Sequence, residues 1–446
     1  MTAPSEPLLL RDLAFGRRPS AASVRAQPYW WDAVPRRETS GASLPAKADV
    51  AVVGSGFTGL SAALTLLDKG LDVVVLDCRV PGYGASTRNG GQVGSGNQKF
   101  RVKRLIALRG EAKAAALLRE GTRMLDYIEH LVTAEKIDCH FRLCGRFRGA
   151  MRPEHYDAMA RDMEDLKRVA GVESFMVPRT EQASEIGSHV FFGGSVLPHD
   201  ASLHPALYHA GLMQCVEARG GRIVGNAGVR RIDRDKNTFH LETDAGRLQC
   251  RDVLVATNGY TSGLVPTLQR RIVTVRSGLI ATAELPADVM TRLMPKGRVY
   301  GNTNRVFYYF RSAPGENRIV WGGRAGRAAG MGAYRHLARD LLAVFPDLGD
   351  IAVTHAWDGQ IGYTHDELPH LGRMADGLHY AVGYCGTGIS RATYFGHKIA
   401  LQMVGDPDGR TAFDDLVFPA FPAHPVAKRA VPVVEAWYRF RDYTKL

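Results

Sequence analysis

The sequence predicts an α/β protein with two domains, and three patterns support this prediction. An apolar strand, a glycine-rich loop, a helix and a second apolar strand follow one another within residues 49–77. Short apolar strands that run into glycine-containing loops recur at residues 252–259 and 378–388. Between them, residues 272–282 and 298–323 alternate β-branched or aromatic residues with polar ones, which is typical of an antiparallel sheet. We therefore expect a Rossmann-like domain that is discontinuous in sequence, and a second domain with a mostly antiparallel β-sheet.

Length and composition exclude several classes of protein. The chain has 446 residues, too many for one small module, and its 45% hydrophobic and 23% charged residues are ordinary for a globular fold. The net charge is +12, but the arginine clusters are only scattered pairs, so we expect a solvated surface and no nucleic-acid partner. The six cysteines show neither a CxxC motif nor metal-ligand spacing, which predicts reduced thiols and no metal site.

The N-terminal region has the features of neither a signal peptide nor a membrane span. It carries only the short apolar run Leu8–Leu10, and nothing in the chain approaches about 18 uninterrupted apolar residues. We expect no transmembrane segment and a cytoplasmic location. Residues 1–47 lack periodicity and are expected to form a surface extension. Within it, Tyr29, Trp30 and Trp31 are expected to pack against the body of the protein, because exposed Trp pairs are costly.

The remaining elements follow from periodicity and from the signals at their ends. A helix over residues 60–69 is expected to end at Gly70, a common C-terminal stop. The other expected helices span residues 104–132, 153–170, 205–219, 336–344 and 388–403. Further strands are expected over residues 141–151 and as a pair between residues 222 and 251.

The loop between the first strand and its helix has the spacing GxGxxG, with Gly54, Gly56 and Gly59. These glycines allow a tight turn, close approach of a pyrophosphate to the backbone, and close packing of the helix on the strand. The helix N-terminus offers N–H groups and its positive dipole end to phosphates. Asp77 follows the second strand, where a carboxylate can accept hydrogen bonds from ribose hydroxyls. This context predicts a bound dinucleotide.

Three further loops favour FAD over a nicotinamide nucleotide, because four loops suit the more extended cofactor. Residues 82–92 are dense in glycine and small polar residues, and Ala256–Gly259 ends a strand. Gly383–Gly388 precedes a helix whose positive end can stabilise a reduced flavin. We expect FAD to be bound by Gly54, Ser55, Gly56, Phe57, Thr58, Gly59, Asp77, Cys78, Arg79, Gly84, Ala85, Ser86, Arg88, Asn89, Gly90, Gly91, Gln92, Val229, Thr257, Asn258, Gly259, Gly383, Cys385, Gly386, Thr387, Gly388 and Ile389.

Residues 48–98 resemble the N-terminus of the D-amino-acid-oxidase superfamily of flavoproteins, most closely its gamma-glutamylputrescine oxidase type. The resemblance continues in consistent order to about residue 440. Its supporting segments are Pro28–Trp31, Arg88–Gln92, Ala256–Tyr260, Tyr309–Arg311, Trp357–Ile361, Thr364–Gly372 and Gly383–Gly388. It implies FAD extended through one domain and the substrate under a β-sheet of the other. It also implies oxidation of a C–N bond from amine to imine, followed by hydrolysis.

Departures from the superfamily pattern narrow the expected substrate. Amino-acid oxidases place an arginine near residues 359–364 to clamp the substrate α-carboxylate, whereas this sequence has Gln360, Ile361 and Gly362. We therefore expect an amine, a polyamine conjugate or a secondary amine with a distal carboxylate. Some relatives attach FAD through a cysteine in the same segment, and its absence here predicts non-covalent FAD. Relatives of the sarcosine-oxidase type place a lysine over the flavin for oxygen activation, and the best local match to it here is Trp321. The electron acceptor could therefore be oxygen or another oxidant.

The resemblance places six candidate residues on the substrate side of the cofactor: Tyr309, Arg311, Trp321, Arg324, Trp357 and His365. Each also has a structural interpretation. The aromatic residues could belong to the core, the arginines could form ion pairs, and the histidine could serve only as a hydrogen-bonding group.

Three hypotheses about function remain open from the sequence. The first is an FAD-dependent amine oxidase or dehydrogenase for a gamma-glutamylputrescine-like substrate, and the second an N-methyl or D-amino-acid oxidase or dehydrogenase. The third is a flavin-binding subunit without catalysis. The oligomeric state is not predicted. The expected divisions are an extension at 1–47, an FAD-binding domain at 48–100, 190–265 and 359–420, a substrate domain at 101–189 and 266–358, and a tail at 421–446.

Overall fold

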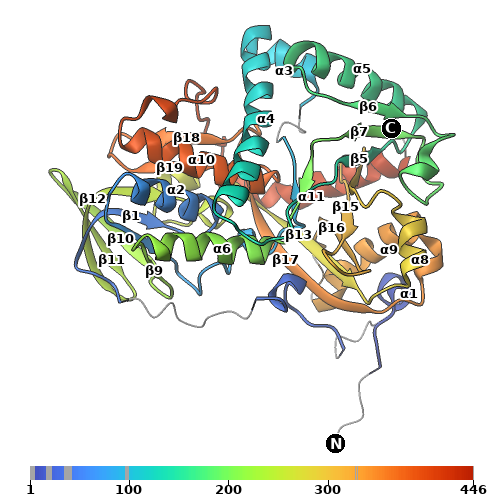
Figure 1. Ribbon diagram of the computed structural model, residues 1–446, viewed down its shortest axis with the longest axis horizontal. Helices are drawn as coiled ribbons and strands as arrows, with labels where there is room; N and C mark the ends of the chain where they lie inside the picture. Colours follow the sequence, from blue (N-terminus) through green and yellow to red (C-terminus); the bar gives the residue numbers. More distant parts are fainter. Residues whose placement is uncertain are drawn as a thin grey trace, which may run out of the picture.

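The computed structural model describes residues 6–16, 23–34, 43–95, 100–326, 328 and 330–444. Parts of the expected N-terminal extension and the last two residues of the expected tail therefore lie outside the described residues. Within these ranges the chain builds two large β-sheets, seen side by side in Figure 1.

The first sheet is an α/β sheet with a parallel centre. Its main path runs in the order β10-β11-β12-β1-β2-β9, and β19, which pairs with β12, adds β18. The β1–β2, β1–β12, β2–β9 and β12–β19 pairs are parallel. The strands are β1 (Lys47–Val53), β2 (Val73–Leu76), β9 (Arg222–Val224), β10 (Val229–Asp235), β11 (Thr238–Thr243), β12 (Gly246–Val255), β18 (His370–Arg373) and β19 (His379–Val382).

Helices bury the centre of this sheet. The side chains of Val50, Val52, Val73 and Val75 are fully buried, as expected for parallel strands covered on their faces. The helices of this part are α2 (Phe57–Asp68), α4 (Glu111–Ala134), α6 (Pro205–Ala218) and α10 (Gly388–Met403). Helix α2 packs against both α6 and α10, which brings the first and last helices of the expected cofactor domain together.

The second sheet runs in the order β17-β13-β16-β15-β14-β5-β7-β6 and is antiparallel except for the β14–β5 pair. Its strands are β5 (Arg146–Gly149), β6 (Phe175–Val177), β7 (Gly194–Leu197), β13 (Val273–Thr282), β14 (Val299–Asn302), β15 (Tyr309–Ser312), β16 (Ile319–Arg324) and β17 (Val353–Tyr363). The predicted fold class is thus confirmed: a Rossmann-like α/β part joined to a mostly antiparallel sheet.

Further helices and a small third sheet complete the described elements. The helices are α1 (Leu10–Phe15), α3 (Val102–Arg109), α5 (Pro153–Ala170), α7 (Pro266–Gln269), α8 (Ala287–Leu293), α9 (Arg335–Val344) and α11 (His424–Thr444). A three-stranded sheet is formed by β3 (Gln92–Val93), β8 (Ala201–Ser202) and β4 (Arg142–Leu143). Through β3, this small sheet ties the end of the glycine-rich 82–92 loop to the segment that leads into β5.

Several expected elements differ from the structure, and glycine explains two of the differences. The helix expected over 104–132 is two helices, α3 and α4, because Gly110 between them has φ +79° and ψ 158°. The strand expected over 141–151 is split at Gly145, whose φ is +70°. The pair expected between 222 and 251 contains β9 and β10 as separate strands, followed by β11 and β12. Strand β17 was not predicted.

The described part of the N-terminal extension packs against the protein, as predicted. Trp30 is fully buried, and its indole Nε1 donates a 2.7 Å hydrogen bond to the carbonyl of Asn89. Trp31 Nε1 donates to Thr87 Oγ1 at 2.9 Å. Both tryptophans therefore hold the 82–92 loop, which was expected to contact the cofactor.

The two sheets do not follow all of the expected domain boundaries. The division into domains therefore stays a prediction. Strand β7 and the end of β17 belong to the second sheet, although they fall within 190–265 and 359–420. Helices α3 and α4, within 101–189, pack into the core beside the first sheet. In the described ranges no helix is both long and apolar enough to cross a membrane.

Candidate active site

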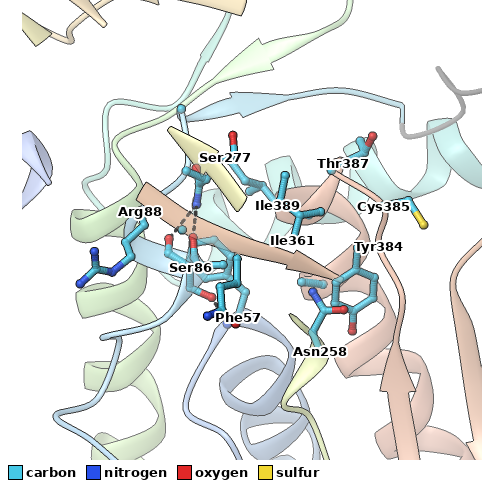
Figure 2. A pocket seen from close by; sticks show the side chains of 18 of the residues that line it. Phe57, Ser86, Arg88, Asn258, Ser277, Ile361, Tyr384, Cys385, Thr387 and Ile389 are labelled. Atoms are coloured by element: carbon cyan, nitrogen blue, oxygen red, sulfur yellow. Dashed lines mark hydrogen bonds between the residues drawn. The ribbon is translucent and has the colours of Figure 1, made fainter. Parts of the chain in front are cut away.

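A cavity of about 850 Å³ lies between the two sheets. Its walls come from the loops that follow β1, β2, β12 and β19, from the second sheet, and from α5. Figure 2 shows Phe57 and Ser86 from the first two loops, Asn258 from the third, and Tyr384, Cys385, Thr387 and Ile389 from the fourth, together with Ser277 and Ile361 of the second sheet. Segments far apart in sequence therefore meet at one site.

The loop after β1 has the backbone that its glycines predict. Gly54 has φ +110°, a conformation that L side chains rarely adopt. A Cβ at Gly59 would lie 1.9 Å from the carbonyl oxygen of Gly54, so only glycine permits this packing of α2 on the loop. Helix α2 begins at Phe57, whose N–H donates to Ser86 Oγ at 2.9 Å. The second loop thereby closes over the helix N-terminus.

Asp77 holds the turn between β1 and α2 in place. Its Oδ2 accepts hydrogen bonds from the Ser55 N–H at 3.0 Å and from the Ser55 hydroxyl at 2.6 Å. Its Oδ1 accepts from the Arg79 N–H at 3.0 Å. A carboxylate has about four lone-pair positions, so these three donors leave room for a further donor from the cavity that Asp77 lines.

The 82–92 loop is held from both sides. Asn89 Nδ2 donates to the carbonyls of Ala85 and Ser86, and its Oδ1 accepts from the Gly91 N–H. Trp357 Nε1 donates to the carbonyl of Arg88 at 2.9 Å. These bonds give the loop one defined shape along the cavity.

A side-chain hydrogen bond joins the third and fourth loops, and a backbone hydrogen bond joins the fourth loop to β17. Asn258 Oδ1 accepts a 2.9 Å hydrogen bond from the Gly383 N–H, which connects the end of β12 to the end of β19. The Cys385 N–H donates to the carbonyl of Gly362 in β17 at 3.1 Å. Helix α10 then begins at Gly388 with its N-terminus at the cavity, where the helix dipole favours negative charge.

Most of the expected cofactor-binding residues line this cavity. They are Gly54, Gly56, Phe57, Thr58, Asp77, Cys78, Arg79, Gly84, Ala85, Ser86, Arg88, Asn89, Gly90, Gln92, Val229, Thr257, Asn258, Cys385, Gly386, Thr387, Gly388 and Ile389. Five others lie behind the wall: Ser55, Gly59, Gly91, Gly259 and Gly383. Their part is to shape the loops, as the Ser55–Asp77 and Gly383–Asn258 hydrogen bonds show.

Two of the six candidates for the substrate side line the cavity, Tyr309 and Arg324. The Tyr309 hydroxyl lies 3.3 Å from Ser277 Oγ, and burial raises its pKa, so the phenol is protonated at neutral pH. Arg324 Nη2 donates to the Tyr363 hydroxyl at 3.0 Å, and its Nε lies 3.5 Å from Glu435 Oε1 of α11. Arg324 thus already has an anionic partner.

The other four candidates, Arg311, Trp321, Trp357 and His365, do not line the cavity. Arg311 Nη1 donates to the carbonyls of Gly91 and Leu203. Trp321 is buried in a separate aromatic core, stacked on Phe310 with ring centroids 4.4 Å apart. Trp357 supports the 82–92 loop from behind. His365 packs edge-on against Phe421.

Sequence reasoning missed several polar residues of the second sheet and α5 that line the cavity: Arg146, Arg148, Asp162, Ser277, Asn302 and Tyr363. The alternation of Arg146 and Arg148 around Phe147 was a signal, because residues two apart on a strand share a face. Asn302 and Asp162 had no comparable signal. Among the residues that the structure describes, no group of three or more His, Cys, Asp or Glu is placed to hold a metal ion.

The residues present fit FAD. Glycines occupy close approaches at the wall: a Cβ at Gly56 would lie 2.9 Å from Ser86 Oγ, and one at Gly90 would lie 2.6 Å from the Tyr309 ring. Two helix N-termini, those of α2 and α10, and the Asp77 carboxylate line one continuous cavity. Anion-binding helix ends together with a carboxylate after the second strand are what phosphates and a ribose require.

A Rossmann-like sheet whose loops share one cavity with an antiparallel sheet is the arrangement expected of a dinucleotide-binding protein. The model of the DAO family, described as FAD dependent oxidoreductase, matches residues 49–402. The chain belongs to this family, and the predicted enzyme class, an FAD-dependent oxidoreductase, is confirmed.

Curated relatives agree with this assignment over most of their length. The chain is 28% identical over 401 residues to "Probable oxidoreductase OrdL" of Haemophilus influenzae, covering 89% of this chain and 92% of the relative. It is 28% identical over 402 residues to "Gamma-glutamylputrescine oxidoreductase" of Escherichia coli, covering 88% and 92%.

Solved structures show the same fold. Glycine oxidase from Geobacillus kaustophilus superimposes with a TM-score of 0.72 at 19% identity, covering 84% of this chain and 99% of that chain. L-proline dehydrogenase from P. horikoshii superimposes with a TM-score of 0.69 at 17% identity, covering 83% and 96%.

Proposed function

We propose that the protein uses FAD to oxidise the C–N bond of an amine to an imine, which water then hydrolyses to an aldehyde or keto product. The observation that carries this proposal is that the four loops and the second sheet share one cavity. Tyr309, Ser277 and Ile361 line it from the second sheet. The curated relative described as a gamma-glutamylputrescine oxidoreductase supports an amine as the substrate.

The residues of the cavity position the reactants. When bound, FAD supplies the acceptor for the hydride that leaves the carbon next to nitrogen. The N-terminus of α10, which lines the cavity, would stabilise negative charge of a group bound beside it. The protonated Tyr309 hydroxyl, held near Ser277, offers a hydrogen-bond donor or acceptor to an amine without exchanging a proton at neutral pH. Gln360, Ile361 and Tyr363 of β17 complete the wall of the cavity.

The residues also favour non-covalent attachment of FAD. Residues 359–364 contain no cysteine. Cys385 is buried, and its thiol contacts Thr364 Oγ1 and the carbonyl of Gly383. Burial raises the pKa of Cys78, so this thiol is a weak nucleophile at neutral pH. The six cysteines are thiols and not disulfides, which supports a reducing compartment, and we keep the cytoplasm as the proposed location.

The substrate that this wall favours lacks an α-carboxylate next to the oxidised carbon. Ile361 lines the cavity in the segment where amino-acid oxidases would supply a clamping arginine. An aliphatic side chain offers no donor to a carboxylate, whereas a methylene chain packs well against it. A polyamine conjugate such as gamma-glutamylputrescine is therefore the proposed substrate, with oxygen or another acceptor taking the electrons.

Anaerobic bleaching of the visible flavin band tests this function. Purified protein is mixed with gamma-glutamylputrescine, putrescine, sarcosine, N-methyl amino acids and D-alanine. We expect bleaching by an amine without an α-carboxylate. Bleaching only by D-alanine, sarcosine or an N-methyl amino acid would show that the protein is an amino-acid oxidase or dehydrogenase. No bleaching by any amine, with FAD bound, would favour a non-catalytic flavin subunit.

The substitution Ile361→Arg sharpens this test. We expect the new guanidinium to shift the preference from the conjugated amine toward D-alanine, because it supplies the absent clamp. Ile361→Leu, which keeps an apolar side chain of equal size, is the matched control and should leave the preference unchanged. An unchanged preference in Ile361→Arg would mean that this position does not face the substrate.

A further inference from the structure

The C-terminal helix α11 holds residues of the active-site cavity, although it lies outside the part of the chain that the family model matches. It packs against β13 of the second sheet and is drawn in red in Figure 1. The Asp442 carboxylate accepts hydrogen bonds from the backbone N–H groups of Arg305 and Val306, at 3.1 and 3.0 Å. The ring centroid of Tyr438 lies 5.5 Å from the Arg305 guanidinium carbon. Because Arg305 lines the cavity, α11 is anchored to the cavity wall.

Arg324 is the cavity residue that α11 contacts through an ion pair. It ends β16 and is registered opposite Ser277 of β13, and both residues line the cavity. Its Nη2 donates to the Tyr363 hydroxyl at 3.0 Å, while its Nε lies 3.5 Å from Oε1 of Glu435 in α11. The side chains of Arg324 and Glu435 are only 19% and 24% exposed, so water screens their interaction less than that of a surface pair.

The charge of Arg324 acts where the substrate is proposed to bind. Burial raises the pKa of Tyr309, and the charge of Arg324 partly opposes this rise, so the field of the guanidinium reaches the phenol. Arg148 and Arg305 line the same cavity, whereas Asp162 of α5 adds a carboxylate. The second-sheet side of the cavity is therefore rich in cations. Without a counter-charge, Arg324 would repel the ammonium group of a substrate.

Glu435 supplies this counter-charge from α11. Burial raises the pKa of Glu435, and the charges of Arg324 and Arg439 oppose that rise, so two arginines favour the ionised carboxylate. Arg324 lies at ion-pair distance from it. Two opposite charges 3.5 Å apart act as a dipole, whose field falls off faster with distance than the field of a single charge. An amine at Tyr309 and Ser277 therefore meets much less repulsion than Arg324 alone would cause.

We propose that Glu435 is a positioning residue that favours amines by neutralising Arg324. It holds the Nε edge of the guanidinium against α11 and offsets its charge, so that a cationic amine binds in preference to an anionic ligand of the same shape. This step rests on the proposed function, in which an amine without an α-carboxylate binds at the Tyr309 and Ser277 wall. Selection among substrates would thus depend on a helix that follows residues 49–402, the range of the family model.

Three ligands of similar shape test this selection on the FAD-loaded protein without turnover. Benzamidine is a cation, benzoate an anion and benzamide neutral, and none has a hydrogen on a carbon bonded to nitrogen. Their dissociation constants are measured from the perturbation of the flavin absorption spectrum. We expect Glu435→Gln to weaken benzamidine binding about threefold to tenfold, to strengthen benzoate binding by a similar factor and to leave benzamide unchanged. A merely structural effect would move all three constants in the same direction.

Further variants serve as controls. Glu181→Gln removes the same charge from an exposed position that does not line the cavity and should leave all three constants unchanged. The double variant Glu435→Gln, Arg324→Gln removes both charges and should restore the wild-type ratio of the benzamidine and benzoate constants. If Glu435→Gln fails to fold, Glu435→Asp, which shortens the side chain by one methylene, should shift the two constants in the same sense by a smaller factor.

Two results would overturn the proposal. One is a wild-type protein that binds neither benzamidine nor benzoate. The other is a pair of constants that does not shift in opposite directions when Glu435 is replaced. Opposite shifts would support the role of Glu435 even if every amine fails to bleach the flavin, so the two proposals can fail separately.

Discussion

Asp77 organises the first cofactor loop through three short hydrogen bonds, two from Ser55 and one from the Arg79 backbone. Its position could be predicted from the sequence, because a carboxylate at the end of the second strand lies at the same sheet edge as the glycine loop. The contacts of Asp77 with Ser55 could not be predicted from the sequence, because they depend on the side-chain rotamers that packing selects.

Replacing Asp77 by Asn should weaken FAD binding. An amide keeps one acceptor oxygen but turns an NH₂ group toward the donors of Ser55 or Arg79, which loses at least one charged hydrogen bond. We expect the dissociation constant of FAD, measured by recovery of flavin fluorescence on dilution, to rise about tenfold to a hundredfold. Asp72→Asn is the control, because Asp72 precedes strand β2 just as Asp77 follows it. This substitution breaks only a surface ion pair with Arg222 and should change the dissociation constant of FAD less than threefold.

Most of the candidates that the sequence suggested for the substrate side do not line the cavity. Motif matching favoured Arg311 and Trp321, but the structure turns one toward backbone carbonyls and the other into an aromatic core. Which face of a strand meets the cavity depends on the position of that strand in the sheet. A one-residue change of register reverses every side chain, so a local pattern alone cannot decide it.

At the scale of elements, glycines mark where predicted helices and strands end. Gly110 separates α3 from α4 with φ +79° and ψ 158°, which periodicity alone did not detect. Strand β17 was missed because Gly359 and Gly362 interrupt its pattern, yet it pairs with β13 along ten registered positions. Tertiary pairing thus overrides weak local propensity.

Gly110→Ala should lower the free energy of unfolding by about 1–3 kcal/mol, because its backbone conformation is nearly exclusive to glycine. No heavy atom lies within 4 Å of a Cβ placed at residue 110. The expected loss of stability would therefore come from backbone strain and not from a steric clash. Urea denaturation measures the change. Gly349→Ala is the control: its φ is −55°, and we expect no loss of stability. Equal stability of both variants would contradict the backbone seen between α3 and α4.

At the scale of the whole molecule, burial of histidines links folding to pH. The pKa values of His204, His336, His379 and His397 are each lowered to about 4, chiefly by burial. A histidine with a lowered pKa binds fewer protons in the folded than in the unfolded state, so its contribution to stability falls as pH drops from about 6.5 to 4. Burial raises the pKa of Asp340 to about 6, so this carboxyl group changes stability with pH in the opposite direction. Its effect is smaller than that of the four histidines together.

The melting temperature should therefore fall between pH 7 and pH 5. Over this interval, protonation at each of the four histidines is expected to lower the free energy of unfolding by about 2 kcal/mol. Asp340 is expected to offset part of this loss. Calorimetry at several pH values measures the slope. His397→Gln should make the slope shallower by removing one of the four groups, whereas His199→Gln, at an exposed ion pair with Glu173, should leave it unchanged. A melting temperature independent of pH would contradict the buried neutral histidines.

The sequence by itself determined the fold class and predicted the DAO-type loops, and most of the residues named in those loops line the cavity. These features are local: a strand, a glycine turn and a helix follow one another within about twenty residues, so short-range geometry specifies them. Only the tertiary structure decided which residues of the second sheet line the cavity. Arg148 and Gly301 lie more than 150 positions apart and are brought together by the parallel pairing of β5 and β14. The register of distant strands, set by burial of apolar faces, decides which polar side chains reach the cavity.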